Sequence, residues 1–231
     1  MINQIVIPNL QNIHIMTLDQ ILDSIKAWND HRNPQGESVI NNYFSEGNCF
    51  LYDPEDFSTA KTNCLHVYLG IFNESIKVFL IPADKDDADH YDSVEGILPY
   101  ITTCALKSSI LETGNLGDEI PTAEAILRIQ NWENNHTTWL AAQSQTVDNI
   151  FQAFTIPSSD IANGHKLRIY FGLKSNPSGG NDIADLLVFD QDENGKLKAV
   201  SRFFDMARPV PPFSSHGELK ESNFYLLEKA L

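Results

Sequence analysis

The sequence has little of what marks a particular class of protein. It contains three cysteines in 231 residues, Cys49, Cys64 and Cys104, with no CxxC pair, so neither a disulfide framework nor a zinc site is expected. No apolar run approaches the roughly 18–20 residues that cross a bilayer, and no basic segment followed by a long apolar one opens the chain. We therefore expect a cytoplasmic protein with reduced thiols.

Basic residues are scarce. The chain has 16 Lys and Arg against 31 Asp and Glu, a net charge of -15, and a field of this sign repels nucleic acid and anionic membranes. The hydrophobic content of 42% and charged content of 20% are typical of a soluble globular protein. The expected partner is another protein or a small neutral or cationic ligand, and the oligomeric state stays open.

Sequence motifs for catalysis are also missing. There is no HExxH, no G-x-S-x-G and no Cys/His cluster at zinc spacing. Gly70 and Gly172 each stand alone inside an apolar segment, which is typical of close backbone approach in a strand rather than of a phosphate-binding loop. No reaction class is therefore indicated.

What the sequence does contain is a repeat. Residues 168–173, Arg-Ile-Tyr-Phe-Gly-Leu, correspond to residues 66–71, His-Val-Tyr-Leu-Gly-Ile. Each is preceded by a helical segment that ends in a tryptophan (Trp28 or Trp132), and then by an extended segment at 49–57 or 153–161. These correspondences indicate that one unit has been duplicated.

The repeat sets the expected domain organisation. We expect a first unit over 1–107, a linker over 108–120, a second unit over 121–213 and a C-terminal helix or tail over 214–231. Each unit is predicted to be α+β, with a helical N-terminal half followed by a small antiparallel sheet. Because small sheets leave unpaired edges, the two units should pair with one another in a pseudo-two-fold arrangement, with the proline-rich segment and last helix covering an edge.

Individual elements follow from periodicity and turn residues. A capping box at Thr17 and Gln20 predicts a helix up to Trp28, and a second long helix should run from Pro121 to Trp132. Shorter helices are expected over 37–45, 139–150 and 218–231. The predicted strands are 49–52, 65–72, 76–82, 152–156, 166–173, 184–190 and 197–204.

The second unit resembles a group of short uncharacterised proteins of Bacteroidota. The matching residues are Ala153, Phe154, Ile156, Pro157, Asp160, Ile161, Arg168, Tyr170, Gly172, 187–190 and 205–212. The first unit matches only through Phe50, Asp56, Tyr68 and Gly70, and it has His66 in place of the arginine. The resemblance implies a shared fold over 121–213, and it supplies no mechanism.

One stretch could bind a metal. Asp190, Asp192, Asn194 and Gly195 reproduce the first half of a calcium loop of the EF-hand type, but Ser201 stands where the bidentate glutamate belongs. Because strands are predicted on both sides, an Asn-Gly hairpin is the favoured interpretation and calcium the alternative. No other cofactor is expected, and the acidic loop over 84–92 is interpreted as a solvated run of charge.

Several polar residues have a structural and a functional interpretation. Tyr68 and Tyr170 are expected to be core tyrosines, whose hydroxyls could bond Asp56 and Asp160. His31 and His136 follow the two tryptophans, which favours a role near helix C-termini. Arg168 has no counterpart in the first unit, and its role stays open.

Two classes of function remain. The favoured one is a non-catalytic binding or assembly module, because the repeated residues are structural types. The alternative is a small-molecule enzyme with its site in the cleft between the units. Its candidate catalytic residues are Tyr170, Arg168, His136 and Asp160, because acid–base chemistry needs titratable groups that converge in one pocket.

Overall fold

The structure is a computed structural model that describes residues 16–32, 40, 42–54, 64–109, 122–144, 150–158, 161, 166–190, 208–210 and 224–231. Its helices are α1 (Leu18–His31), α3 (Ala88–Tyr91), α4 (Thr122–Gln143) and α5 (Tyr225–Ala230), with short 3-10 turns η2 (Phe44–Glu46), η4 (Ala83–Lys85) and η5 (Leu98–Tyr100). Its strands are β1 (Cys49–Tyr52), β2 (Cys64–Phe72), β3 (Ser75–Pro82), β4 (Thr102–Ala105), β5 (Ala153–Pro157), β6 (Leu167–Lys174), β7 (Ile183–Asp190) and β8 (Arg208–Val210). The α+β class is confirmed.

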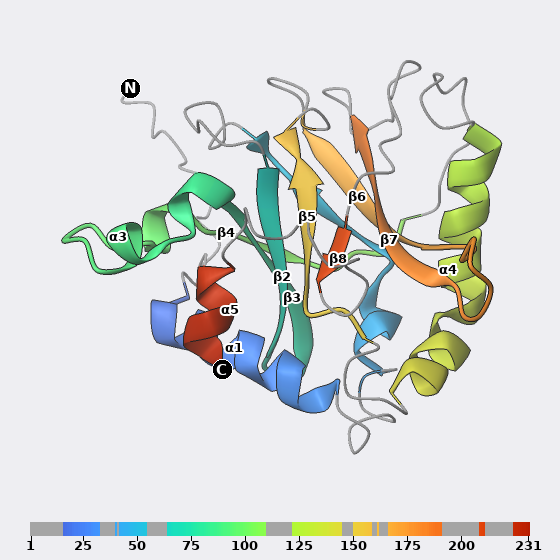
Figure 1. The fold of residues 1–231 in the computed structure, drawn as a ribbon, viewed down its shortest axis with the longest axis horizontal. Helices are drawn as coiled ribbons and strands as arrows, with labels where there is room; N and C mark the ends of the chain where they lie inside the picture. Colours follow the sequence, from blue (N-terminus) through green and yellow to red (C-terminus); the bar gives the residue numbers. More distant parts are fainter. Residues whose placement is uncertain are drawn as a thin grey trace, which may run out of the picture.

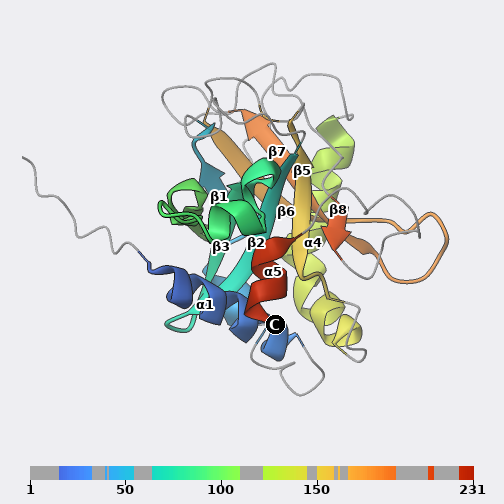
Figure 2. The same cartoon turned by 60° about the vertical axis from the view of Figure 1, so that its left-hand side comes forward.

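The strands form two antiparallel sheets that pack face to face (Figure 1). One sheet has three strands in the order β1-β6-β7, and the other has five in the order β4-β3-β2-β5-β8. A single cluster of buried side chains from the inner faces of both sheets fills the space between them, with Leu69 and Phe171 among its members. Helix α1 covers the outer face of the five-stranded sheet and α4 covers that of the three-stranded sheet, so the molecule has four layers (Figures 1 and 2).

Each sheet takes strands from both halves of the chain. Strand β1 pairs with β6, so that Cys49 lies opposite Tyr170, and β5 pairs with β2, so that Ala153 lies opposite Tyr68. The hairpins β2–β3 and β6–β7 complete the two sheets. Neither half forms its sheet alone, because the first strand of each half lies in the sheet that the other half's hairpin builds.

The first strands of the two halves also have further partners, and each sheet has a close contact with a helix. Cys49 pairs with Lys107, and Ala153 pairs with Val210. A Cβ at Gly70 would meet Ser24 of α1, and one at Gly172 would meet Arg128 of α4, so a single strand glycine lets each helix pack closely on its sheet. Each sheet thus has a strand pair from both halves of the chain and a strand glycine that faces a helix.

Helix α1 follows its prediction, whereas α4 does not. The Thr17–Gln20 capping box is present, and Trp28 is fully buried. The predicted break between a helix ending at Trp132 and another starting at 139 is wrong, because α4 is continuous over 22 residues. No proline or glycine interrupts it, and the buried face continues through Trp139 and Leu140. His136 therefore lies within a helix and not near its end.

The predicted strands over 49–82 and 152–190 are confirmed to within about two residues. Some predictions lie outside the described residues: the strand over 197–204, Asp56, Asp160 and most of the linker. The last helix is shorter than expected. It packs on the outer face of the five-stranded sheet and not on an edge, because Leu226 and Leu227 continue the apolar surface beside α1. Within the described residues, no helix has the length and apolar character needed to cross a membrane.

Candidate functional site

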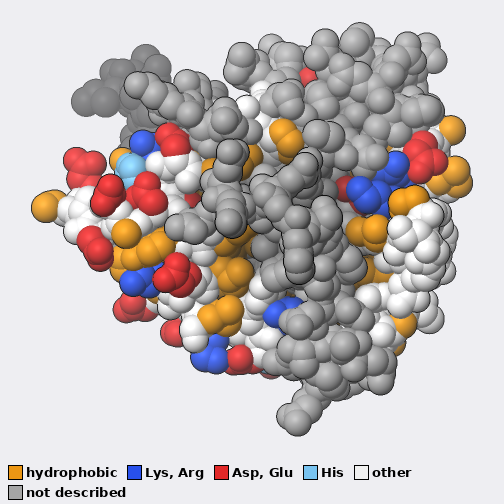
Figure 3. Space-filling view, in the orientation of Figure 1, with side chains coloured by type: hydrophobic (Ala, Val, Ile, Leu, Met, Phe, Trp, Pro, Cys, Tyr) orange, Lys and Arg blue, Asp and Glu red, His pale blue; other side chains and the backbone are white. Residues whose placement is uncertain are grey.

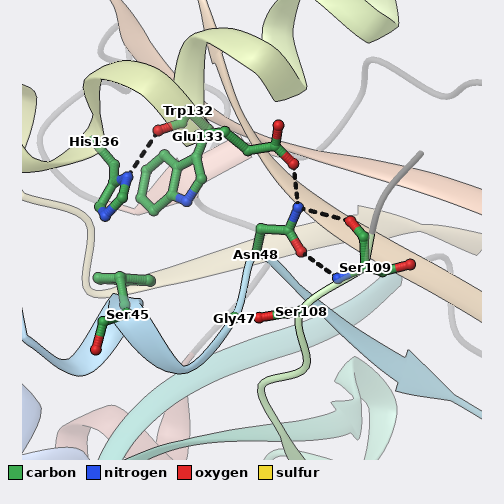
Figure 4. Close-up of a pocket in the computed structure, with 9 residues that line it drawn as sticks. Ser45, Gly47, Asn48, Ser108, Ser109, Trp132, Glu133 and His136 are labelled. Atoms are coloured by element: carbon green, nitrogen blue, oxygen red, sulfur yellow. Dashed lines mark hydrogen bonds between the residues drawn. The ribbon is translucent and has the colours of Figure 1, made fainter.

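A cavity of about 490 Å³ opens where the two halves of the chain meet (Figure 4). Its walls come from the turn before β1, from the segment after β4 and from one side of α4. The lining residues are Phe44, Ser45, Gly47, Asn48, Ser108, Ser109, Trp132, Glu133 and His136. We call this space the junction cavity.

The two backbone walls of the junction cavity are in direct contact. The amide nitrogens of Asn48 and Cys49 donate to the Lys107 carbonyl oxygen at 3.1 and 3.2 Å, and the Lys107 nitrogen donates to the Cys49 carbonyl oxygen at 2.8 Å. Gly47 is required beside them, because a Cβ there would lie 2.3 Å from the Lys107 carbonyl carbon. The backbone therefore fixes the distance between these walls.

The side chain of Asn48 joins the third wall to the other two. Its Oδ1 accepts from the Ser109 nitrogen at 3.0 Å, and its Nδ2 donates to the Ser109 carbonyl oxygen at 3.1 Å and to Glu133 Oε1 at 2.5 Å (Figure 4). Both polar atoms of the amide are thus used within the protein. Asn48 holds α4 against the two loops and shapes the cavity.

Trp132 forms the aromatic wall, but other rings cover both faces of its indole ring. Its ring is stacked between His136, at 5.6 Å between ring centroids, and Phe171, at 5.1 Å. Phe44 meets it edge-on at 5.0 Å, and only 1% of the Trp132 surface is exposed. The tryptophan therefore packs in the core, and a ligand would contact the outer side of the His136 ring.

His136 is the imidazole ring in the wall. Its Nδ1 lies 2.9 Å from the Trp132 carbonyl oxygen, which can only accept, so Nδ1 carries a hydrogen and Nε2 is an acceptor in the neutral ring. The Ser45 hydroxyl points away from His136 in Figure 4 and bonds the Asn42 carbonyl oxygen at 2.5 Å. Among the described lining residues, His136 is thus neither oriented by a carboxylate nor bonded to a nucleophile.

Two further candidates lie directly behind the cavity wall. Arg168 Nη1 donates to the Ser109 Oγ at 2.5 Å, and the Tyr170 hydroxyl donates to the same oxygen at 3.1 Å. The Ser109 hydroxyl lies on the side of that residue away from Asn48 (Figure 4). Arg168 and Tyr170 therefore support the wall through Ser109 and do not line the cavity, while Asp160, the fourth candidate, lies outside the described residues.

The acidic loop contains a buried carboxylate, so its interpretation as solvated charge is wrong at Asp86. Asp86 Oδ2 accepts from His66 Nδ1 at 2.6 Å and from the Tyr68 hydroxyl, and Asp86 is 1% exposed. Burial, together with the charge of Asp86, raises the pKa of Tyr68 well above its usual range. The sequence predicts Asp56 as the partner of Tyr68, whereas the structure gives the Tyr68 hydroxyl the partner Asp86.

The calcium hypothesis falls mostly on residues that are not described. Asp190 ends β7 and is half-buried, whereas Asp192 and Asn194 lie outside the described residues. Within the part of the chain that the structure describes, no three His, Cys, Asp or Glu side chains converge as metal ligands.

The thiols give a prediction that depends on pKa. Burial raises the pKa of Cys49 to about 11 and that of Cys104 to about 12. At pH 8 the reactive thiolate is therefore a very small fraction of each, and at most one thiol per folded chain should react quickly with a chromogenic disulfide reagent. In denaturant all three should react. Rapid reaction of two or more thiols in the native protein would contradict the burial of these side chains.

Sequence reasoning missed the residues that shape the junction cavity. Asn48, Glu133 and Ser109 stand at no motif spacing, and only the polar Gly-Asn pair directly before an apolar strand could have drawn attention. What the site offers is a cavity with an imidazole ring and an exposed carboxylate, while the hydroxyls of its three serines are bonded within the protein. No family model and no curated protein matches the sequence, and no solved structure matches the fold.

Proposed function

We propose that this protein is a non-catalytic binding module that holds a small neutral or cationic molecule in the junction cavity. The observation that carries the proposal is the set of hydrogen bonds around Asn48, which fixes all three walls through contacts within the protein. A preformed cavity binds without the cost of ordering its walls. Its volume of about 490 Å³ suits a small organic molecule.

The polar groups of the cavity favour a ligand that donates hydrogen bonds. His136 Nε2 is an acceptor, and the Glu133 carboxylate is solvent-exposed. The net charge of -15 raises the local concentration of cations and opposes anions. An amine or a heteroaromatic ring with an N–H group would satisfy both groups while it lies on the His136 ring.

Catalysis is less well supported by the same geometry. A base that acts on a nucleophile is normally within hydrogen-bond reach of it and is oriented by a third group. The Ser45 hydroxyl donates to the Asn42 carbonyl oxygen, and the Ser108 hydroxyl donates to the Glu46 carbonyl oxygen at 3.5 Å. The Ser109 hydroxyl accepts from Arg168. The described hydroxyls of the cavity are therefore bonded elsewhere, and the geometry favours binding.

We also infer that the two halves are copies of one unit that exchange their first strands. The inference is supported by the equivalent pairs Cys49–Tyr170 and Ala153–Tyr68 and by the equivalent glycine contacts. Exchange hides sheet edges that each unit would otherwise expose. The junction cavity then needs both halves of the chain. We also propose that the protein is cytosolic, because its three cysteines are free thiols.

Ligand-observed NMR with a panel of small aryl amines and N–H heteroaromatics tests the binding proposal. Ser45 is exposed at the cavity, so Ser45→Trp should fill the space without disturbing the core and should abolish the saturation-transfer signals. Thr137→Trp, at an exposed position on α4 outside the lining, is the matched control and should keep them. The proposal fails if no compound binds or if Ser45→Trp binds as the wild type does. Chemical conversion of a bound compound would favour the enzyme.

A further inference from the structure

The C-terminal residues 224–231, which we call the C-terminal strap, lie on the outer face of the five-stranded sheet (Figures 1 and 2). Their helix α5 has six residues. Leu226, Leu227 and Ala230 are buried there against α1 and the apolar outer side chains of β2 and β3. The strap is thus a short amphipathic helix seated in an apolar surface.

Buried polar side chains hold the start of that helix. Asp86 Oδ1 accepts from the Leu226 nitrogen at 3.0 Å, and the Tyr68 hydroxyl oxygen accepts from the Leu227 nitrogen. The Phe224 ring stacks on His66 at 4.2 Å between ring centroids. The surface therefore binds two successive backbone N–H groups of the helix and the ring of Phe224, which precedes them in the sequence.

The strap leaves part of this surface unsatisfied. His66 Nε2 and Thr155 Oγ1 are buried and have no hydrogen-bond partner among the described residues. His66 and Thr155 lie opposite each other in the β2–β5 register, so both atoms belong to one patch of the outer face. Buried polar groups favour an occupant that bonds them, and the described residues of the strap do not bond these two.

Charge around the strap favours a basic helix. Lys229 lies over the rings of Tyr91 and Tyr225, at 5.4 and 5.0 Å from their centroids. The segment beside it, which contains α3, carries exposed or half-exposed acidic residues, and acidic side chains surround the apolar ones on this part of the surface in Figure 3. A cation in the last turn of a bound helix also interacts favourably with the helix dipole.

We propose that this surface is a recognition site for a short basic amphipathic helix of a protein partner, and that the C-terminal strap occupies it until the partner displaces the strap. The partner helix offers an aromatic residue just before it, two successive leucines in its first turn and a basic residue two positions after the second leucine, as the strap itself does. A polar group near its aromatic residue would also satisfy His66 and Thr155. This site is separate from the junction cavity and does not depend on the function proposed for it.

Native-state hydrogen exchange tests whether the strap is detachable in the wild-type protein. The amides of Leu226 and Leu227 should exchange at least about a hundredfold faster than those in the centre of β2, because they open locally and without global unfolding. If they exchange only through global unfolding, the strap is a fixed part of the core and the proposal is wrong.

A peptide of sequence 224–231, labelled with a fluorophore, tests recognition on the full chain. The double substitution Leu226→Asp and Leu227→Asp should release the strap, and the peptide should then bind at least about tenfold more tightly than to the wild type, whose tethered strap competes at high effective concentration. Glu228→Ala, at an exposed strap position, is the matched control and should behave as the wild type. Adding Tyr68→Phe to the released variant should weaken binding again. Equal binding by released and wild-type chains, or a released variant that does not fold, overturns the proposal.

Discussion

Gly47→Ala is expected to lower the free energy of unfolding by about 3 kcal/mol, near the upper end of the range for overpacked sites. The added Cβ would lie 2.3 Å from the carbonyl carbon of Lys107 and 2.4 Å from its oxygen. These are backbone atoms held by the hydrogen bonds between Lys107 and residues 48–49, so they cannot move without breaking the contact of the two halves. Chemical denaturation measures the loss, and the melting temperature should fall by roughly 6–12 °C.

Gly172→Ala is the control for this prediction. Its Cβ would meet the end of the Leu187 side chain at 2.5 Å, which can rotate away, and Arg128 Cβ at 3.3 Å. The loss should therefore be clearly smaller than for Gly47→Ala. Equal losses for the two variants, or a neutral Gly47→Ala, would contradict the backbone contact at the junction.

Trp28→Ala should cost about 3–5 kcal/mol of stability, the usual range for removing a large aromatic side chain from a core. Trp28 is 0% exposed, packs in the cluster between the sheets and stacks on Phe151 at 5.7 Å between centroids. Its Nε1 also donates to the Phe151 carbonyl oxygen at 3.1 Å, which ties α1 of the first half to a segment of the second. Denaturant unfolding followed by circular dichroism gives the difference.

Leu127→Ala provides the comparison, because it also truncates a large apolar side chain on a helix. Leu127 is 55% exposed, so its loss should change stability by no more than about 0.5 kcal/mol. If Trp28→Ala were as mild as Leu127→Ala, the common core of the two halves would not exist as described.

Local patterns made the elements predictable. The capping box at Thr17 and the alternation around Tyr68 and Tyr170 act within a few residues, and the structure has α1, β2 and β6 at those places. The length of α4 differs from the prediction because the apolar stripe does not end at Trp132 but continues in a second buried turn at Trp139.

No local sequence pattern predicts the pairing of strands across the two halves. Strand β1 could pair with β2 of its own half as well as with β6, since both carry the same alternation and a tyrosine two residues before a glycine. The choice depends on packing across the whole molecule. The same holds for Asp86, whose partners Tyr68 and Leu226 are 18 and 140 residues away, so that its burial is invisible in an acidic run.

The walls of the junction cavity could not be predicted from the sequence. A site between the halves that includes His136 stays a prediction, but the three walls are joined by Asn48, which contacts residues 61 and 85 positions away. Arg168 has no counterpart in the first half, where His66 stands at the corresponding position. The structure gives Arg168 a supporting role behind Ser109.

The binding site in the junction cavity is best tested by a crystal structure of the protein soaked with the compound that binds most tightly in the NMR panel. We predict the unmodified compound in the junction cavity, against the His136 ring and within hydrogen-bond distance of Nε2, with the Asn48 hydrogen bonds unchanged. A compound bound elsewhere, walls that rearrange to admit it, or a chemically altered product in the cavity would contradict a preformed, non-catalytic binding site.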